Sequence, residues 1–350
     1  MDFEERYALV TRNLPEILGK DEFRTIMMNR SPVIYWGTAP TGRIHVGYLV
    51  PLQKIADFLN AGCTVIILIA DLHAVLDSNK SSFEQVAKRT QYYERIIKIT
   101  LVRLGADISR IQFIIGSKFQ KNQEYFYDVM RASTITTVHD ALKSATEVVK
   151  QSDNPLLSSL LYPVMQVLDM EHLGADAFFG GIDQRKINVL GLSLLPALGY
   201  SKRAYLMNRM VPSLSKVAGG TNGKMSSSDN VSKIDLLDNK KTVDDKVKQA
   251  YCLEGEVNDN TPLILMENVI FPILERLGEN FVCNRPAKWG GPLTYTDFES
   301  IRRAFESKEL HPSDFKKGIV DSLNFILDPV RKEFETNENQ QLLIDAYGSI

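Results

Sequence analysis

The chain has 350 residues, of which 44% are hydrophobic and 24% are charged, and its formal net charge is −2. Such a chain can bury a substantial core and has the composition of an ordinary globular protein with two domains. It has no overall basic excess, so any contact with nucleic acid must come from local patches. No apolar run approaches the length of a membrane span.

Cysteine usage and the N-terminal segment indicate a cytoplasmic location. Cys63, Cys252 and Cys283 are odd in number and widely spaced, which favours a reducing compartment over a zinc site or a disulfide framework. The first residues include Asp2 and Glu4, and this charged segment matches neither a secretory signal nor an arginine-rich transit peptide.

Short β-branched runs alternate with helical periodicity through the first two thirds of the chain. Helices are expected at 48–59 and 83–104, and strands at 33–36, 65–70, 111–115, 175–179 and 204–207. Near-continuous apolar strands separated by helices predict an α/β fold, a Rossmann-like doubly wound parallel sheet covered on both faces. Ligands of such sheets bind beyond the carboxyl ends of the strands, so we expect one crevice to receive Tyr35, Trp36, Asp71 and His73.

The alternation breaks between about residues 118 and 151, where a helical insertion is expected between two halves of the sheet. Its helical stripe consists of Tyr125, Val129, Ala132, Thr136 and His139.

The remainder of the chain changes character after a polar segment. Residues 213–232 are rich in Ser, Gly and Lys and predict a mobile linker. Beyond it only helices are expected, at 243–251, 262–277, 296–307, 312–327 and 329–347. We therefore expect a first domain over residues 1–233 and an all-α second domain over residues 234–350.

Two separate segments have the properties of a phosphate clamp. Thr38 to Gly47 follows a strand and opens a helix, which places free backbone N–H groups and a positive dipole end against an anion, with His45 able to donate to a phosphate oxygen. Lys224 to Ser228 is a polar loop with one cation and three hydroxyls, suited to close over a polyphosphate. Each segment alone is more often an ordinary turn or surface loop, so the pairing carries the signal.

Together these segments resemble the HIGH and KMSKS signatures of class I aminoacyl-tRNA synthetases. The resemblance extends over nearly the whole chain, through Ala70–Ala74, Leu161–Pro163 and Gly180–Gln184. Within this class the sequence most resembles the tyrosyl-tRNA synthetases of the eukaryotic and archaeal type. Tyr48 stands where the second His of HIGH would be, and Ser227 stands for the second Lys of KMSKS, so the phosphate site has fewer formal positive charges.

A polar helix face supplies the candidate amino-acid pocket. Tyr162, Gln166 and Asp169 fall at i, i+4 and i+7 and share one face of an apolar helix. Spacing alone leaves open an internal polar network, or Asp169 capping a helix or facing water. The resemblance implies that Asp169 accepts from the substrate phenol, that Tyr35 donates to the same oxygen, and that Tyr162, Gln166 and Gln184 hold the ammonium group. For Asp71 and His73 a pocket-lining role and a core role both stay open.

The resemblance also implies an adenylate site, in which His45 and Lys224 stabilise charge that develops on the phosphates. Asp183 would bind a ribose hydroxyl, although it could equally be the N-cap of a helix. Magnesium would arrive with ATP, and no cluster of His, Cys and Asp suggests a metal held by the protein. The residues implied for ATP are Thr41, Gly42, His45, Gly47, Gly181, Asp183, Lys224, Met225, Ser226 and Ser228.

The resemblance implies that the partners are L-tyrosine, ATP and tRNA(Tyr). It also implies that the helical insertion binds a second copy of the chain. The alternative for the insertion is a helical hairpin packed on its own domain. Trp289 beside glycines would stack on an anticodon base and Asp314 would accept from guanine. Core packing for Trp289 and a helix N-terminal turn for Asp314 remain alternatives.

Three other functions are the alternatives to a tyrosyl enzyme: a tryptophanyl enzyme, a small nucleotidyltransferase and a non-enzymatic binding module. A Tyr35–Asp169 pair aimed at a substrate hydroxyl favours the tyrosyl enzyme.

Overall fold

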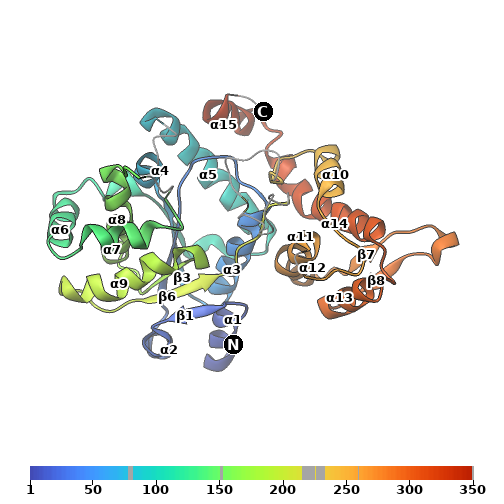
Figure 1. Ribbon diagram of the computed structural model, residues 1–350, viewed down its shortest axis with the longest axis horizontal. Helices are drawn as coiled ribbons and strands as arrows, with labels where there is room; N and C mark the ends of the chain where they lie inside the picture. The colour runs from blue at the N-terminus through green and yellow to red at the C-terminus, as the bar shows by residue number, and fades with distance from the viewer. Residues whose placement is uncertain (78–81, 150–152, 215–224, 226–232, 259, 349–350) are drawn as a thin grey trace.

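The computed structural model describes residues 1–77, 82–149, 153–214, 225, 233–258 and 260–348. Within these residues the main sheet has six strands in the order β1-β6-β5-β2-β3-β4, and neighbouring strands are parallel except for β1, which is antiparallel to β6 (Figure 1). The strands are β1 (Glu16–Leu18), β2 (Val33–Thr38), β3 (Thr64–Ile69), β4 (Ile111–Ile115), β5 (Ala177–Gly181) and β6 (Ala204–Asn208). The predicted doubly wound sheet is confirmed, and the half-buried edge strand β1 is an addition to it.

Helices cover both faces of this sheet because successive strand residues point to opposite sides. Ile34 and Trp36 of β2 belong to the core that includes α3 (Leu49–Asn60) and α5 (Phe83–Arg103). Tyr35 of the same strand belongs to the core on the other face, which is covered by two further helices, α8 (Leu157–His172) and α9 (Arg185–Ala197). Tyr35 and Trp36 thus point to opposite faces of the sheet, yet both line one cavity together with His73, as expected, whereas Asp71 does not.

The predicted insertion is helical, as expected. It contains α6 (Gln123–Ser133) and α7 (Val138–Ala145), which lie between β4 and β5 in the chain and pack against α8 (Figure 1). On α6, Val129 and Ala132 are buried, whereas Phe126 and Tyr127 on the opposite side are exposed. The insertion therefore has one apolar face inside the fold and another on its surface.

The C-terminal part is mainly helical, but the expectation of helices alone needs one correction. Strands β7 (Phe281–Cys283) and β8 (Leu293–Tyr295) form a short antiparallel hairpin. Its buried residues Phe281 and Cys283 pack so closely on Gly318 that a Cβ there would lie 2.7 Å from the Phe281 ring. The helices are α10 (Lys240–Gln249), α11 (Thr261–Leu265), the π-helical turn Met266–Ile270, α12 (Phe271–Leu277), α13 (Phe298–Glu306), α14 (Pro312–Glu333) and α15 (Asn337–Tyr347).

Helix α14 continues through Pro329, where the sequence pattern predicted a break. Proline removes one N–H and thereby frees the carbonyl four residues earlier, which here belongs to Phe325. Arg103 of α5 donates to that carbonyl over 3.4 Å, so the freed acceptor finds a partner on another helix.

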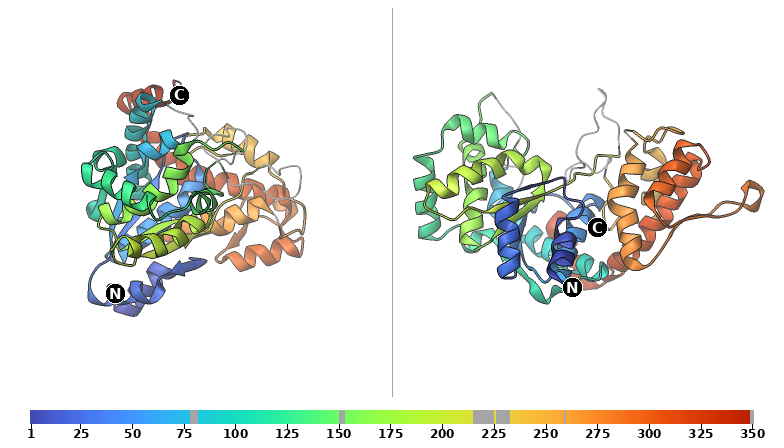
Figure 2. Two further views of the ribbon diagram at one scale, coloured as in Figure 1. Left: turned by 60° about the vertical axis from the view of Figure 1, so that its left-hand side comes forward. Right: turned by 90° about the horizontal axis from the view of Figure 1, so that it is seen from below.

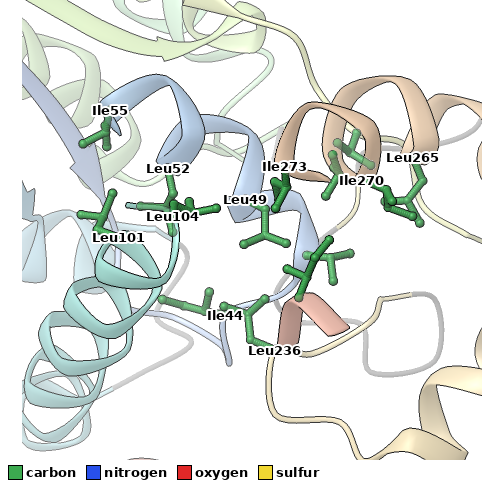
Figure 3. Close-up of a cluster of buried hydrophobic side chains, with 14 of the residues drawn as sticks. Ile44, Leu49, Leu52, Ile55, Leu101, Leu104, Leu236, Leu265, Ile270 and Ile273 are labelled. Atoms are coloured by element: carbon green, nitrogen blue, oxygen red, sulfur yellow. The ribbon is translucent and has the colours of Figure 1, made fainter. Parts of the chain in front are cut away.

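The two parts of the chain share one apolar core. Figure 3 shows Leu49 of α3 beside Ile273 of the C-terminal helices, while Leu52 of α3 lies beside Leu104 at the end of α5. The last helix, α15, returns to pack on α5 (Figures 1 and 2). None of the helices in the described part of the chain has both the length and the apolar character that a membrane span requires.

The remaining short elements are α1 (Phe3–Thr11), α2 (Lys20–Asn29), α4 (Asp71–Leu76) and the 3₁₀ turns Val46–Tyr48, Ile108–Arg110, Gly116–Lys118, Ile182–Gln184 and Ala287–Trp289.

Candidate active site

A cavity of about 710 Å³ opens at the carboxyl ends of β2, β5 and β6. It receives most of the residues that the sequence singles out for tyrosine and ATP. Those that line it are Tyr35, Thr41, His45, Gly47, Tyr162, Gln166, Asp169, Gly181, Asp183, Gln184 and Met225. Gly42 is not among the lining residues, and Lys224, Ser226 and Ser228 lie outside the described residues.

Asp169 of α8 is the buried carboxylate of the cavity. It is 1% exposed, which excludes the alternative that it faces water. Its Oδ1 accepts from Gln120 Nε2 and from the Tyr125 hydroxyl, each over 2.8 Å, while Oδ2 lies 3.9 Å from His73 Nε2. Burial raises the pKa of Asp169 to about 7, against the opposing effect of the two hydrogen bonds. The carboxyl group thus has one saturated oxygen and one oxygen turned toward His73.

The open question about Asp71 and His73 is answered differently for each residue. His73 is buried, lines the cavity and meets the Tyr162 ring edge-on at 4.7 Å. Burial lowers the pKa of His73 to about 4, so its imidazole is neutral at physiological pH. Asp71 does not line the cavity; its Oδ1 accepts from the backbone N–H groups of Leu72 and Ser117 over 3.0 and 2.7 Å. Asp71 is therefore a structural link between α4 and the end of β4.

Tyr35, Gln166 and Gln184 bring polar groups from three elements into the cavity. The Tyr35 hydroxyl donates to the backbone carbonyl of Gln166 over 3.2 Å, and Gln166 Nε2 donates to Gln184 Oε1 over 3.0 Å. Burial, with a further effect from Asp169, raises the pKa of Tyr35 well above its usual value. The hydroxyl therefore remains a donor at every physiological pH.

His45 lies at the start of the turn that leads from β2 into α3. Its Nδ1 accepts from the Gly47 N–H over 3.2 Å, and in a neutral ring this places the proton on Nε2. The ring also packs edge-on against Tyr48 at 5.0 Å. A Cβ at Gly47 would lie 2.8 Å from His45 Cε1, so a side chain at this position would displace the His45 ring. The turn thus presents an N–H donor beside the N-terminal end of α3.

The other glycine of this turn, Gly42, is tied to the rest of the protein through its carbonyl. The Gly42 carbonyl accepts from two hydroxyls, that of Tyr93 over 2.6 Å and that of Tyr347 over 2.9 Å. The next residue, Arg43, pairs with Asp235 over 2.9 Å. The backbone at Gly42 is thus fixed by two side chains and an adjacent ion pair.

The Gly-Gly-x-Asp turn allows close backbone approach at the end of β5. A Cβ at Gly181 would displace the side chains of Asp183 and Met210, both of which line the cavity. Gln184, rather than Asp183, is the N-cap residue of α9, which removes the capping alternative for Asp183. Met225 is buried against the cavity, and its N–H donates to the Val211 carbonyl over 3.1 Å.

Two residues that hold Asp169 were not predicted as site residues. Gln120 follows β4, and Tyr125, on α6, appears in the sequence only as one member of a helical stripe. Tyr125 is 44 residues away from Asp169 in the chain, and no local spacing connects them. Helical periodicity predicts that Tyr125 is buried, but it gives no information about its partner.

The candidate anticodon residues lie in the C-terminal part, and the β7–β8 connection projects away from the sheet (Figure 1). Trp289 on this connection is 66% exposed, so core packing is excluded. Lys288 Nζ lies 5.6 Å from the Trp289 ring centroid, and Gly290 and Gly291 have φ values of 93° and 74° that favour glycine. Asp314 lies in the first turn of α14. No group of three or more His, Cys, Asp or Glu side chains placed to hold a metal occurs in the described ranges.

Comparison with known proteins identifies the family. Residues 27–328 match the model of the class I tRNA synthetases (W and Y). The chain is 48% identical to the cytoplasmic tyrosine–tRNA ligase of Danio rerio over 98% of this chain and 63% of that protein. It is 46% identical to the cytoplasmic tyrosine–tRNA ligase of Saccharomyces cerevisiae over 97% of this chain and 87% of that protein.

A solved structure agrees with these relatives. The tyrosyl-tRNA synthetase of Archaeoglobus fulgidus complexed with L-tyrosine superimposes with a TM-score of 0.84 at 37% identity, over 95% of this chain and 99% of that one. The chain spans about 63% of the length of the vertebrate relatives. On this evidence the chain belongs to the class I tRNA synthetases, within the tyrosine–tRNA ligases of the eukaryotic and archaeal type.

Proposed function

We propose that the chain is a tyrosine–tRNA ligase, which joins L-tyrosine and ATP into tyrosyl-adenylate with release of pyrophosphate and then transfers tyrosine to the 3′ end of tRNA(Tyr). One observation carries the choice of amino acid: the buried carboxylate of Asp169 and the buried hydroxyl of Tyr35 line the same cavity. This pair suits a ligand hydroxyl that both donates and accepts a hydrogen bond.

The amino-acid pocket selects by the cost of unpaired polar groups. The substrate phenol would donate to Asp169, whose Oδ1 is already held by Gln120 and Tyr125, and it would accept from Tyr35. Tyr162, Gln166 and Gln184 would hold the ammonium group. A phenylalanine side chain would offer no donor to Asp169 Oδ2 and would leave the Tyr35 hydroxyl with only its bond to the Gln166 carbonyl, which disfavours phenylalanine.

The chemistry of activation requires positioning and charge stabilisation. The tyrosine carboxylate attacks the α-phosphorus in line, a P–O bond to pyrophosphate breaks, and negative charge grows on the phosphates. The His45 Nε2–H and the start of α3 would stabilise this charge on one side and Lys224 on the other. Mg²⁺ would enter with ATP, Asp183 would bind a ribose hydroxyl, and Thr41 and Ser228 would add contacts to the phosphates. The ATP site would be completed by Gly42, Gly47, Gly181, Met225 and Ser226.

Two exposed parts of the chain would bind partners: the C-terminal part would bind tRNA and the helical insertion would bind a second copy of the chain. Trp289 and Asp314 would read the anticodon, and the helical part from residue 234 onward would be the tRNA-reading domain beside a catalytic domain over residues 1–233. The chain would form a homodimer through the insertion, whose exposed apolar residues are Phe126, Tyr127, Met130, Ile135 and Val138. A cytoplasmic location is supported by the names of the yeast and vertebrate relatives.

Pyrophosphate exchange with ATP, measured with each amino acid in turn, tests the function. We expect exchange with tyrosine and only trace exchange with phenylalanine or tryptophan. Tyr35→Phe should lower the tyrosine-to-phenylalanine ratio, because it removes the donor to the phenol oxygen. Tyr7→Phe, on α1 outside the cavity lining, is the matched control. Exchange driven by tryptophan, or a ratio unchanged by Tyr35→Phe, would contradict the pocket.

A further inference from the structure

We propose that the C-terminal helix α15 takes part in adenylate formation through Tyr347, a positioning residue that fixes the turn carrying His45. The inference rests on the proposed function and adds a residue that lies outside the cavity lining. Tyr347 is separated from the turn by 305 residues, yet its hydroxyl donates to the Gly42 carbonyl over 2.9 Å.

The Gly42 carbonyl is saturated by two hydroxyls. Tyr93 of α5 donates over 2.6 Å and Tyr347 of α15 donates over 2.9 Å, which uses both lone pairs of the oxygen. Burial raises the pKa of both hydroxyls, so both remain donors. The backbone entering the turn is thus held by side chains from two different helices.

The rest of the turn is tied down on its other side. The Val46 N–H donates to the Ile234 carbonyl over 2.9 Å, and the Leu236 N–H donates to the Ile44 carbonyl over 3.0 Å. His45 lies between the two bonded residues Ile44 and Val46. Because only Arg43 and Ile44 separate Gly42 from His45, a shift of the backbone at Gly42 also moves His45. Catalytic groups need placement within a fraction of an ångström, and the turn has little freedom to compensate.

Helix α15 is itself anchored on α5, which Figure 1 and Figure 2 show at its side. The Tyr347 ring meets Tyr92 edge-on at 5.3 Å and lies 5.2 Å from the Arg89 guanidinium. At the other end of α15, Arg95 donates to Asn339 over 3.0 Å. These contacts hold the ring without the hydroxyl, so removal of the hydroxyl isolates its bond to Gly42.

The experiment is Tyr347→Phe in the full chain, assayed by tyrosine-dependent pyrophosphate exchange. The lost hydrogen bond should lower kcat by about three- to tenfold. The KM for tyrosine should stay unchanged, since Asp169 and Tyr35 lie on other elements. Tyr93→Phe removes the other donor to the same carbonyl and should give the same division between kcat and KM, which keeps the test valid if Tyr347→Phe folds poorly.

Controls separate positioning from simple stability. Tyr7→Phe removes a hydroxyl on α1 away from the turn and should change neither constant. A Tyr347→Phe variant with wild-type kcat, or one whose KM for tyrosine rises as much as its kcat falls, overturns the inference and leaves the proposed function standing. A wild-type chain without tyrosine-dependent exchange overturns both.

Discussion

Asp169 is the residue whose environment has the most direct consequence for stability. Its pKa of about 7 lies above the usual value of 3.8, so the folded protein binds this proton more tightly than the unfolded chain does. The free energy of unfolding therefore contains a contribution that is complete below about pH 4 and is lost as the pH rises through about 7. At pH 8 the ionised, buried carboxylate is a destabilising group.

Asp169→Asn should accordingly stabilise the chain at pH 8 while abolishing tyrosine selectivity. We expect a gain in unfolding free energy on the order of a few kcal/mol at pH 8, decreasing toward zero near pH 4. Urea unfolding at several pH values measures it, with Glu254→Gln on an exposed loop as the control. A gain that does not depend on pH would mean that the pKa of Asp169 is the same in the folded protein as in the unfolded chain.

The sequence predicts residues of a site when they share one periodic element or one short turn motif, and fails for supporting residues that are distant in the chain. Tyr162, Gln166 and Asp169 were found because a helix repeats its face at i, i+4 and i+7, and all three line the cavity. Gln120 and Tyr347 were missed as supporting residues because each meets its partner only through the folded chain. Periodicity encodes burial, whereas the identity of a distant partner depends on topology.

At the scale of elements, Asp57 of α3 connects three helices. Its carboxylate accepts from Arg12, which follows α1, over 2.7 Å and from Lys54 of α3 over 3.2 Å, and it pairs with Arg276 of α12. Lys54 also donates to the carbonyl of Leu9 on α1 over 2.7 Å. The N-terminal helix, the helix after the His45 turn and the C-terminal helices thus meet at one buried anion.

Asp57→Ala should destabilise the chain by about 3–5 kcal/mol, because it leaves buried cations without their common partner. Thermal or urea unfolding measures the loss. Glu4→Gln, which removes the exposed partner of Arg24, is the matched control and should leave the transition nearly unchanged. Equal effects of the two substitutions would show that the Asp57 cluster is no more than a surface ion pair.

Helix α6 has two faces with different tasks. Tyr125 and Val129 are buried toward the pocket, whereas Phe126 and Tyr127 are exposed, Tyr127 by 65%. Tyr127→Glu should therefore shift the proposed homodimer toward monomer, measured by sedimentation equilibrium. Phe83→Glu replaces an equally exposed aromatic residue on α5 and should not change the mass. A monomeric wild type, or a dimer that survives Tyr127→Glu, would favour a surface hairpin without a partner.

Long periodic or apolar elements were predictable from the sequence, and short ones were not. The runs at β2, β3, β5 and β6 were found because burial on both faces removes polar residues, and the half-buried edge strand β4 was found from its apolar run. Strand β1 and the β7–β8 hairpin have only three residues in each strand, too few to show an alternation. Pro329 predicted a helix end because sequence does not reveal that Arg103 satisfies the freed carbonyl.

At the scale of the whole molecule, the residues proposed for amino-acid activation and those proposed for anticodon reading belong to different parts of the chain. The cavity lies at the carboxyl ends of the sheet strands, whereas Trp289 lies on the connection that projects from the C-terminal part (Figure 1). Because the exposed ring of Trp289 contributes little to the core, its removal should leave the sheet and its cavity intact.

Trp289→Ala should lose about 1–3 kcal/mol of stacking on an anticodon base and raise the KM for tRNA. Asp314→Ala should in addition weaken the preference for guanine, since it removes the acceptor for the guanine N–H donors. Pyrophosphate exchange without tRNA should be unchanged in both variants, because neither residue lines the cavity. Aminoacylation of wild-type and anticodon-substituted tRNA, measured beside the exchange reaction, decides the matter. Equal damage to both reactions would mean that Trp289 supports the fold rather than the tRNA, and that the two activities are not separated along the chain.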